Sequence, residues 1–361
     1  MLDEFVAKKP RESAGTRSSN RFDYQLSWAF CLLLNMEKSG RDYLLVLDYH
    51  DDVVVFDSET APSKADFYQV KTDTRNRWTL TRLLEKAGDS THSILGKLYG
   101  HRLEFAQKAS TLNFVSNQLF SLKTLKSPDR ASDVELCTLA ELCADSLLEI
   151  KHQLKAEHAL SEDPVIGLEV ILKREEIIAA GHKLYAEGAL SRFLSEQYGN
   201  KPYSVSHAFT ALIDLLRRRS HCEDELTSVQ DLKLKKSVGR AEFRALIEKV
   251  GQSASSETWR TMEALLIQGG TNMLKLSRYK NAWNTREVEL LDPSNLVVQS
   301  TQREIERVVE RVIEAAPDAS IVDWLNEANT QCLPVLERLG VPLGDDQMTG
   351  AILSSISTEF Q

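Results

Sequence analysis

The sequence predicts an α/β N-terminal region followed by a mostly α-helical C-terminal region. Helix and strand signals alternate through about the first 125 of the 361 residues, and apolar residues at helical spacing dominate afterwards. Hydrophobic residues make up 42% of the chain and charged residues 27%, which is ordinary for a globular protein with a packed core. We therefore expect two regions, residues 1–125 and residues 126–361.

The first region begins with a predicted helix and continues with three predicted strands. Asn20 is a suitable helix cap, apolar residues follow at helical spacing, and Gly40 ends the pattern. The segments 42–48, 52–57 and 66–72 are rich in β-favouring residues. Between the last two segments, SETAPSK contains a proline and small polar residues, which predicts a hairpin loop.

A second helical pattern runs from about residue 80 to residue 108, and a further strand is predicted at 111–117. Together with the preceding elements, these make a compact α/β unit of about 120 residues. Its order is helix, three strands, helix and strand.

The second region shows two sequence patterns typical of helix starts. Ser132 with Glu135 forms a capping box ahead of a helical apolar stripe, and Thr301 with Glu304 forms another. No repeat of fixed period is found along the chain. The patterns predict helices but say nothing about their task.

Charge is distributed unevenly along the chain, whose net charge is −9. Residues 1–125 carry 17 Lys and Arg against 16 Asp and Glu, whereas the remainder carries 27 against 37. We therefore expect any nucleic-acid contact in the first region, while the acidic remainder suits protein partners.

Several classes of protein are excluded or disfavoured. No apolar run approaches the roughly 18–20 residues that cross a bilayer, and the first 20 residues lack the apolar stretch of a signal peptide. We expect a cytoplasmic protein with no membrane partner. The five cysteines are scattered and form no CxxC pair, so free thiols are expected. No GxxxxGK[ST] motif occurs, which argues against P-loop nucleotide hydrolysis.

Carboxylates gather at the entrance of the second predicted strand, in DYHDDVVVFD at 48–57. Asp52 opens that strand. On the next strand, Gln69 and Lys71 are two residues apart and therefore project to the same face. If SETAPSK turns a hairpin, the two strands lie about 4.8 Å apart, and a carboxylate, an amide oxygen and an ammonium converge at one end of a sheet.

This set of groups suits metal-dependent hydrolysis of a phosphodiester. Oxygen ligands hold Mg²⁺, and a bound metal polarises the phosphate and lowers the pKa of the attacking water. A lysine orients that water or neutralises charge in the transition state. Two other interpretations remain open, because a QxK triplet is common on exposed strands and an Asp pair before a strand also serves turn or edge chemistry.

The segments RFDYQLSWAFCLLLN, LLVLDYHDDVVVFD, DFYQVKT and LNFVSNQLF, in this order, resemble the nuclease domain of the CD-NTase-associated DNA endonuclease effectors. That family belongs to the PD-(D/E)XK restriction-endonuclease-like superfamily and serves bacterial anti-phage defence. The resemblance covers roughly residues 12–120, and residues 226–250 resemble a helical segment of related proteins. It implies a restriction-endonuclease-like nuclease domain at 1–125, and a regulatory, oligomerisation or partner-binding role for the helices of 126–361.

The resemblance also implies roles for individual residues. Asp52 matches the metal-binding aspartate, Gln69 the second motif position and Lys71 the catalytic lysine. Gln25 matches a helix-borne glutamine beside the site.

One departure concerns the metal ligands. The usual second acid of the superfamily is Gln69 here, so the site has one negative charge fewer. This leaves more of the coordination to Asp48, Asp51 and the Val70 carbonyl. Asp51 and Asp52 are both candidates for the closest contact, and we favour Asp52 because it directly adjoins the strand.

Four arginines are candidates for contacts with the DNA backbone, namely Arg17, Arg21, Arg75 and Arg77. The alternative for the last two is a solvated loop beside a core tryptophan.

The function implied by the resemblance is a Mg²⁺- or Mn²⁺-dependent endonuclease that cuts double-stranded DNA as the effector of a defence system. The expected partners are an SMC-like ATPase and a small accessory subunit, as in Lamassu systems, or a HerA-type ATPase. We expect a homo-oligomer in the active state, because a double-strand break needs two opposed sites. The alternatives are a catalytically silent docking subunit, or a nuclease that cuts single strands or RNA.

Overall fold

The structure is a computed structural model of the chain. It describes residues 1–8, 19–73, 76–88, 90–167, 169–199, 205–253, 256–290 and 295–358. The chain divides into two compact units. The first contains residues 1–189 and 216–243, and the second contains residues 190–215 and 244–361.

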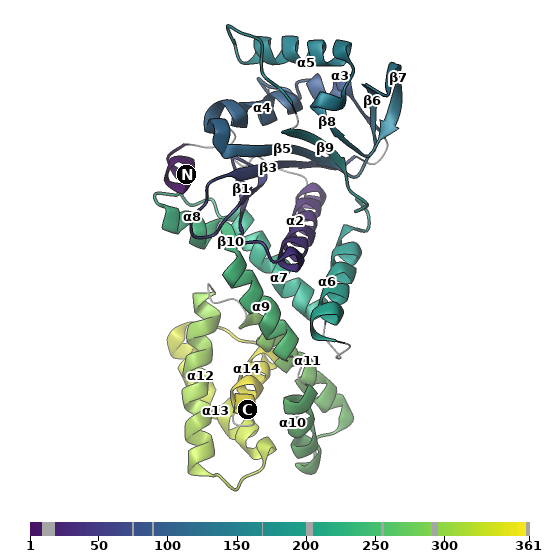
Figure 1. The fold of residues 1–361 in the computed structure, drawn as a ribbon. Helices are drawn as coiled ribbons and strands as arrows, with labels where there is room; N and C mark the ends of the chain where they lie inside the picture. The colour runs from purple at the N-terminus through teal and green to yellow at the C-terminus, as the bar shows by residue number, and fades with distance from the viewer. Residues whose placement is uncertain are drawn as a thin grey trace. The chain divides into compact units, whose positions relative to one another are not determined.

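A seven-stranded sheet organises the first unit, with the strand order β10-β1-β2-β3-β5-β9-β8 (Figure 1). The strands are β1 (Leu44–Tyr49), β2 (Asp51–Phe56), β3 (Ala65–Lys71), β5 (Ala109–Ser116), β8 (Leu136–Thr138), β9 (Val170–Arg174) and β10 (Ser237–Gly239). Strands β1, β2 and β3 are antiparallel neighbours, which confirms the predicted hairpin at SETAPSK. Strands β3, β5 and β9 run parallel, so their carboxyl ends meet at one edge of the sheet.

The hairpin between β1 and β2 is unusually tight, and the sequence DYHDD explains how it forms. Tyr49 pairs with Asp51, and a single residue, His50, lies between them. Asp48 and His50 have positive φ angles of 48° and 67°. Asp and His are among the residue types that enter this left-handed region most readily. Part of the acidic cluster therefore serves the turn.

A three-stranded sheet accompanies the large one, with the order β4-β6-β7. Its strands are β4 (Trp78–Thr79), β6 (Phe120–Thr124) and β7 (Ser127–Val134). Strands β4 and β6 pair in parallel, with Trp78 beside Phe120. This pairing anchors the chain soon after it leaves β3.

The first unit contains all or part of the helices α1 (Leu2–Ala7), α2 (Ser19–Ser39), α3 (Leu80–Leu84), α4 (Ile94–Phe105), α5 (Ala144–Glu157), α6 (His182–Tyr198), α7 (Val205–His221), α8 (Val229–Lys235) and α9 (Arg240–Ser253). Short 3-10 turns occupy Ala106–Lys108 and Leu139–Glu141. The predicted helix at 20–40 is confirmed, and the pattern at 80–108 corresponds to α3, α4 and the first 3-10 turn.

Helices α2 and α4 cover opposite faces of the large sheet. Trp28 of α2 packs against Tyr68 of β3 with 5.2 Å between ring centroids. His101 of α4 stacks on Phe67, the preceding residue of β3, at 4.5 Å. Because successive side chains of a strand point to opposite faces, the two helices lie on the two sides of β3.

The face covered by α4 carries a large apolar core. Phe56, Phe67, Phe105 and Phe114 are fully buried within it. Burial of one such side chain stabilises the fold by about 1.5–3 kcal/mol. The end of the sheet is thus supported by a packed and rigid layer, which is what precise placement of functional side chains requires.

The second unit is helical. Its further helices are α10 (Ser256–Gln268), α11 (Met273–Glu289), α12 (Leu296–Ala315), α13 (Ile321–Leu339) and α14 (Asp345–Thr358). Helix α14 is buried along most of its length and packs against α11. At Gly350 the two backbones approach so closely that a Cβ atom would lie 2.3 Å from the carbonyl oxygen of Ala282.

The two predicted capping boxes are wrong. Ser132 lies in β7, and Glu135 lies between β7 and β8, because pairing with β6 and β9 overrides the local capping pattern. Helix α5 begins only at Ala144. Thr301 and Glu304 lie inside α12, whose N-cap is Asn295.

A mixed α/β N-terminal region followed by a helical C-terminal region is confirmed, and the sheet continues past residue 125 through β8, β9 and β10. The division into functional domains at residue 125 stays a prediction. All five cysteines are free thiols, as expected. In the part of the chain that the structure describes, no helix has both the length and the apolar character that crossing a membrane requires.

Candidate active site

Strands β2 and β3 stop pairing at the residues that the sequence singles out. The last pair of their register at this end is Val53 with Tyr68. One residue further on, a side chain replaces the backbone partner: Oδ2 of Asp52 accepts a hydrogen bond of 2.8 Å from the backbone N–H of Val70. Asp52 is buried, with 6% of its surface exposed. Its carboxylate is therefore held at the point where the two strands separate.

Gln25 satisfies the other backbone group of Val70. Gln25 lies on helix α2, and its Nε2 donates a hydrogen bond of 3.0 Å to the Val70 carbonyl oxygen. Buried backbone groups that lack a partner cost free energy comparable to a lost hydrogen bond, so Asp52 and Gln25 complete the end of β3. Val70 lies between Gln69 and Lys71, and both neighbours are thus fixed relative to Asp52.

Gln69 and Lys71 project from β3 on the face that Phe67 shares with α4, since alternate residues of a strand point the same way. Gln69 is buried, and its Oε1 has no hydrogen-bond partner among the residues that the structure describes. Lys71 is half-buried. This buried amide oxygen therefore has an unused acceptor capacity.

The remaining aspartates occupy different surroundings. Oδ2 of Asp51 lies 3.0 Å from Nε2 of His101, and its Oδ1 accepts a hydrogen bond of 2.9 Å from the backbone N–H of Asp52. Asp48 is half-buried at the tight turn, and its carbonyl accepts a hydrogen bond of 3.4 Å from Lys236. The hydrogen bond from Val70 joins the carboxylate of Asp52 to the Gln69-Val70-Lys71 strand, whereas Asp51 is paired with His101.

The donors at this sheet end fit a hard divalent cation. The Asp52 carboxylate, the Gln69 amide oxygen and the Val70 carbonyl are all oxygen ligands, the kind that Mg²⁺ takes while retaining several waters. Within the described residues, no group of three His, Cys, Asp or Glu side chains is placed to hold a metal. Any ion here would thus depend on amide and backbone oxygens besides carboxylate.

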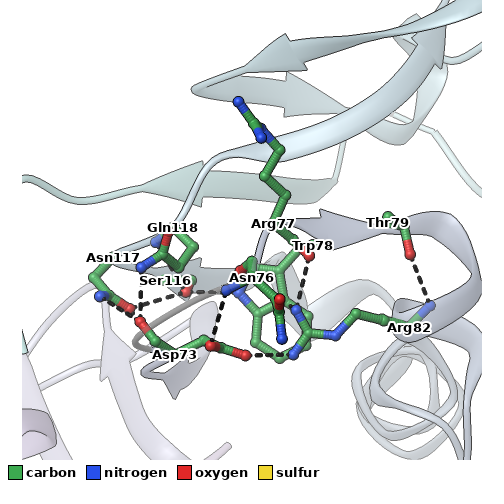
Figure 2. A network of polar contacts seen from close by, with 9 residues as sticks. All are labelled: Asp73, Asn76, Arg77, Trp78, Thr79, Arg82, Ser116, Asn117 and Gln118. Carbon is green, nitrogen blue, oxygen red and sulfur yellow. Dashed lines mark hydrogen bonds and ion pairs between the residues drawn. The ribbon is translucent and has the colours of Figure 1, made fainter.

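A polar network holds the segment that follows Lys71, as Figure 2 shows. The backbone N–H of Asp73 donates to Oδ1 of Asn117 at 3.0 Å. Its carbonyl accepts from Asn117 at 2.8 Å and from Gln118 at 2.7 Å. Lys71 pairs with Ser116 in the parallel strands β3 and β5, so the turn after β5 lies beside this segment. The network therefore fixes the chain two residues beyond the candidate lysine.

Arg82 closes the network from helix α3. Its Nη2 lies 2.6 Å from Oδ2 of Asp73, and its Nη1 donates to the Arg77 carbonyl at 2.7 Å. The guanidinium lies 4.1 Å from the ring centroid of Trp78, whose Nε1 donates to Ser116 at 2.7 Å. In Figure 2 the arginine, the tryptophan and the aspartate converge. Cation–π contact and ion pairing together hold Asp73, Arg77 and Trp78 against helix α3.

The four candidate DNA-binding arginines differ in how much can be said of them. Arg17 and Arg75 lie outside the described residues. Arg21 is exposed on α2. The side chain of Arg77 leaves the network of Figure 2 and forms two contacts of 2.8 Å with Asp133, which raise the pKa of the guanidinium. A DNA phosphate would have to compete with this aspartate for Arg77.

Sequence reasoning missed two groups of residues near the site. His101 lies about 50 positions after the aspartates on an apolar helix, where nothing marks it as their partner. The positions of Asn117 and Gln118 could have been predicted. They directly follow β5, which runs parallel to β3 and ends at the same edge of the sheet, so their side chains are expected near the end of β3.

The chain matches the family described as "Cap4, dsDNA endonuclease domain" over residues 13–220, more than half of its length. It is also 24% identical over 242 residues to the Lamassu protein LmuA of Bacillus cereus (strain VD014). That similarity covers 66% of this chain and 64% of the relative, so the chain spans slightly less than two thirds of the relative's length. No solved structure matches significantly. The family match includes Gln25, Asp52, Gln69 and Lys71, and the chain belongs to the Cap4 double-stranded DNA endonuclease family.

Proposed function

We propose that this protein is a divalent-metal-dependent endonuclease that cuts double-stranded DNA, with its active centre where β2 and β3 separate. The observation that carries the proposal is the bond from the Val70 amide to Asp52, which sets a buried carboxylate beside the Gln69–Lys71 strand. Membership of the family supports the substrate class. A restriction-endonuclease-like fold of the PD-(D/E)XK kind for residues 1–125 is part of the same proposal.

Each side chain has a distinct role in this scheme. Asp52, Gln69 and the Val70 carbonyl would hold Mg²⁺ or Mn²⁺, with Asp48 and Asp51 adding negative charge nearby. When bound, such an ion polarises the phosphate and lowers the pKa of the attacking water. Lys71 neutralises charge that develops on the phosphate oxygens in the transition state. Gln25 orients the Val70 carbonyl through its hydrogen bond.

DNA contacts are proposed for the arginines around this sheet end. Arg21 on α2 and Arg77 after β3 would bind backbone phosphates, together with Arg17 and Arg75. Such contacts position the duplex without reading its sequence. Because Arg77 is paired with Asp133, we expect it to contribute less than an arginine that has no carboxylate partner.

The setting proposed for this nuclease is bacterial defence, and the similarity to a Lamassu protein supports it. The helices of residues 126–361 would regulate the nuclease or bind partners, which we expect to be an SMC-like ATPase and a small accessory subunit, or a HerA-type ATPase. Two copies acting on opposed strands would produce a double-strand break, so we expect activity to depend on oligomerisation.

Incubation of the chain and its partner subunits with plasmid and Mg²⁺ or Mn²⁺ tests the proposal. Wild-type protein should convert supercoiled plasmid to linear product, and Lys71→Ala should lower the rate at least about 100-fold while leaving assembly intact. Lys64→Ala is the matched control, because Lys64 is exposed and precedes the same strand. If wild type and Lys71→Ala are equally inert with partners present, the chain is a docking subunit instead. A single-stranded or RNA substrate in the same assay tests the third alternative.

A further inference from the structure

A buried contact between a histidine and an aspartate lies directly behind the candidate metal-binding aspartate. The side chains of His101 and Asp51 are only 4% and 5% exposed, and Nε2 of the histidine is 3.0 Å from Oδ2 of the carboxylate. Taking a carboxylate out of water is costly unless hydrogen bonds compensate it. His101 provides that compensation for Asp51.

The pair is connected to the candidate site by two further hydrogen bonds. Oδ1 of Asp51 accepts from the backbone N–H of Asp52 at 2.9 Å. Oδ2 of Asp52 in turn accepts from the backbone N–H of Val70 at 2.8 Å. An unbroken chain of contacts therefore runs from His101 on α4, through both aspartates of β2, to the strand that carries Gln69 and Lys71.

The histidine itself is rigidly held. Its ring stacks on Phe67 with centroids 4.5 Å apart and an angle of 14° between the planes. Its Nδ1 has no hydrogen-bond partner among the described residues. The ring nitrogen that does have a partner, Nε2, contacts Asp51. A phenylalanine would stack on Phe67 equally well and would leave no buried nitrogen unpaired, so packing alone does not explain a histidine here.

We propose that His101 is a positioning residue for metal binding, which acts by fixing Asp51 and, through it, the carboxylate of Asp52. The inference rests on the proposed function, and it assigns Asp51 the task of orienting its neighbour. Partners behind a metal ligand set the direction of the ligand's oxygens, and their removal typically lowers metal affinity about 10–100-fold. His101 itself touches neither metal nor substrate.

Two substitutions separate positioning from packing. His101→Phe keeps a ring that can stack on Phe67 and removes the donor to Asp51. His101→Gln removes the ring, but its amide nitrogen reaches the place of Nε2 and donates to the carboxylate. We expect His101→Phe to weaken Mn²⁺ binding to the full chain about 10–100-fold by calorimetry, and His101→Gln to stay within about 3-fold of wild type.

Plasmid cleavage at increasing Mn²⁺ provides the second measurement. The concentration that gives half-maximal cutting should rise for His101→Phe in step with its binding constant. Wild-type affinity in His101→Phe would overturn the inference, as would equal losses in both variants, because the ring alone would then matter. Should His101→Phe fail to fold, His101→Asn replaces it, since its shorter amide cannot reach Asp51 and the same weakening is expected.

Failure of the proposed function gives a different pattern. In that case Asp52→Asn binds Mn²⁺ as well as wild type does, and both proposals fall together. If Asp52→Asn loses the ion while His101→Phe retains it, the proposed function stands and only the role of His101 is refuted.

Discussion

Removal of Arg82 should loosen the loop that follows Lys71. The arginine forms an ion pair of 2.6 Å with Asp73, and the two side chains are 29% and 18% exposed. It also donates to the Arg77 carbonyl and lies over the ring of Trp78. A hydrogen bond between charged groups contributes about 1.5–3 kcal/mol and a cation–π contact about 0.5–1 kcal/mol, and partial exposure reduces both. We expect Arg82→Ala to destabilise the first unit by about 2–3 kcal/mol.

Thermal denaturation measures that loss. For a unit of this size the melting temperature should fall by about 4–12 °C. At a temperature where the variant is still folded, plasmid cleavage should fall about 10- to 100-fold, because misplacement of a catalytic group by about 1 Å has effects of this size. Arg82→Lys retains the charge but not the fork of donors, so it should lie between wild type and Arg82→Ala.

Lys155→Ala is the control, because Lys155 forms a largely exposed pair with Asp163 in the same unit. Such pairs contribute about 0.2–1 kcal/mol, so its melting temperature should change much less. An Arg82→Ala variant that melts and cuts like wild type would show that the loop needs no clamp. A variant that is destabilised but cuts normally would show that the loop does not position Lys71.

Two further predictions concern stability. Burial lowers the pKa of His182, whose Nδ1 lies 2.8 Å from Ser27 Oγ, so the folded state resists its protonation. The free energy of unfolding should therefore be retained above the ordinary pKa of 6.5 and should decline as the pH falls below it, by up to about 1.4 kcal/mol per pH unit. Urea denaturation at several pH values measures this decline, which should be shallower in His182→Gln. Gly350→Ala should destabilise the second unit by more than about 2 kcal/mol, because the added Cβ would clash with the carbonyl oxygen of Ala282. A Cβ at Gly188 would meet nothing within 4 Å, so Gly188→Ala should be neutral or stabilising. Calorimetric melting measures both effects.

The strands around the candidate site were predictable because each buries a run of β-favouring residues. Strand β2 (Asp51–Phe56) and strand β3 (Ala65–Lys71) lie within a residue or two of the predicted segments, and the hairpin loop contains the proline and small polar residues that marked it. Alternation along β3 also predicts that Gln69 and Lys71 share one face of the sheet.

The partners of these strands were not predictable from local patterns. The capping box at Ser132 and Glu135 failed because β6 and β9 offer strand partners that are distant in sequence, and pairing with them outweighs a local helix signal. The contact between His101 and Asp51 escaped notice for a related reason. It joins a helix to a strand across 50 residues, and no periodicity relates the two positions.

Asp52 has two roles where β2 and β3 separate, one structural and one in the proposed metal binding, and a single substitution can affect both. Its carboxylate replaces a backbone acceptor for the Val70 N–H, and it is also the proposed ligand for the metal. Asp52→Ala would remove both, and a buried N–H left without a partner costs about 1–3 kcal/mol in itself. Asp52→Asn keeps a side-chain oxygen that accepts from Val70 and removes only the charge. Loss of Mn²⁺ binding at unchanged melting temperature in Asp52→Asn would therefore attribute the effect to the ligand, whereas loss of both would attribute it to the end of the sheet.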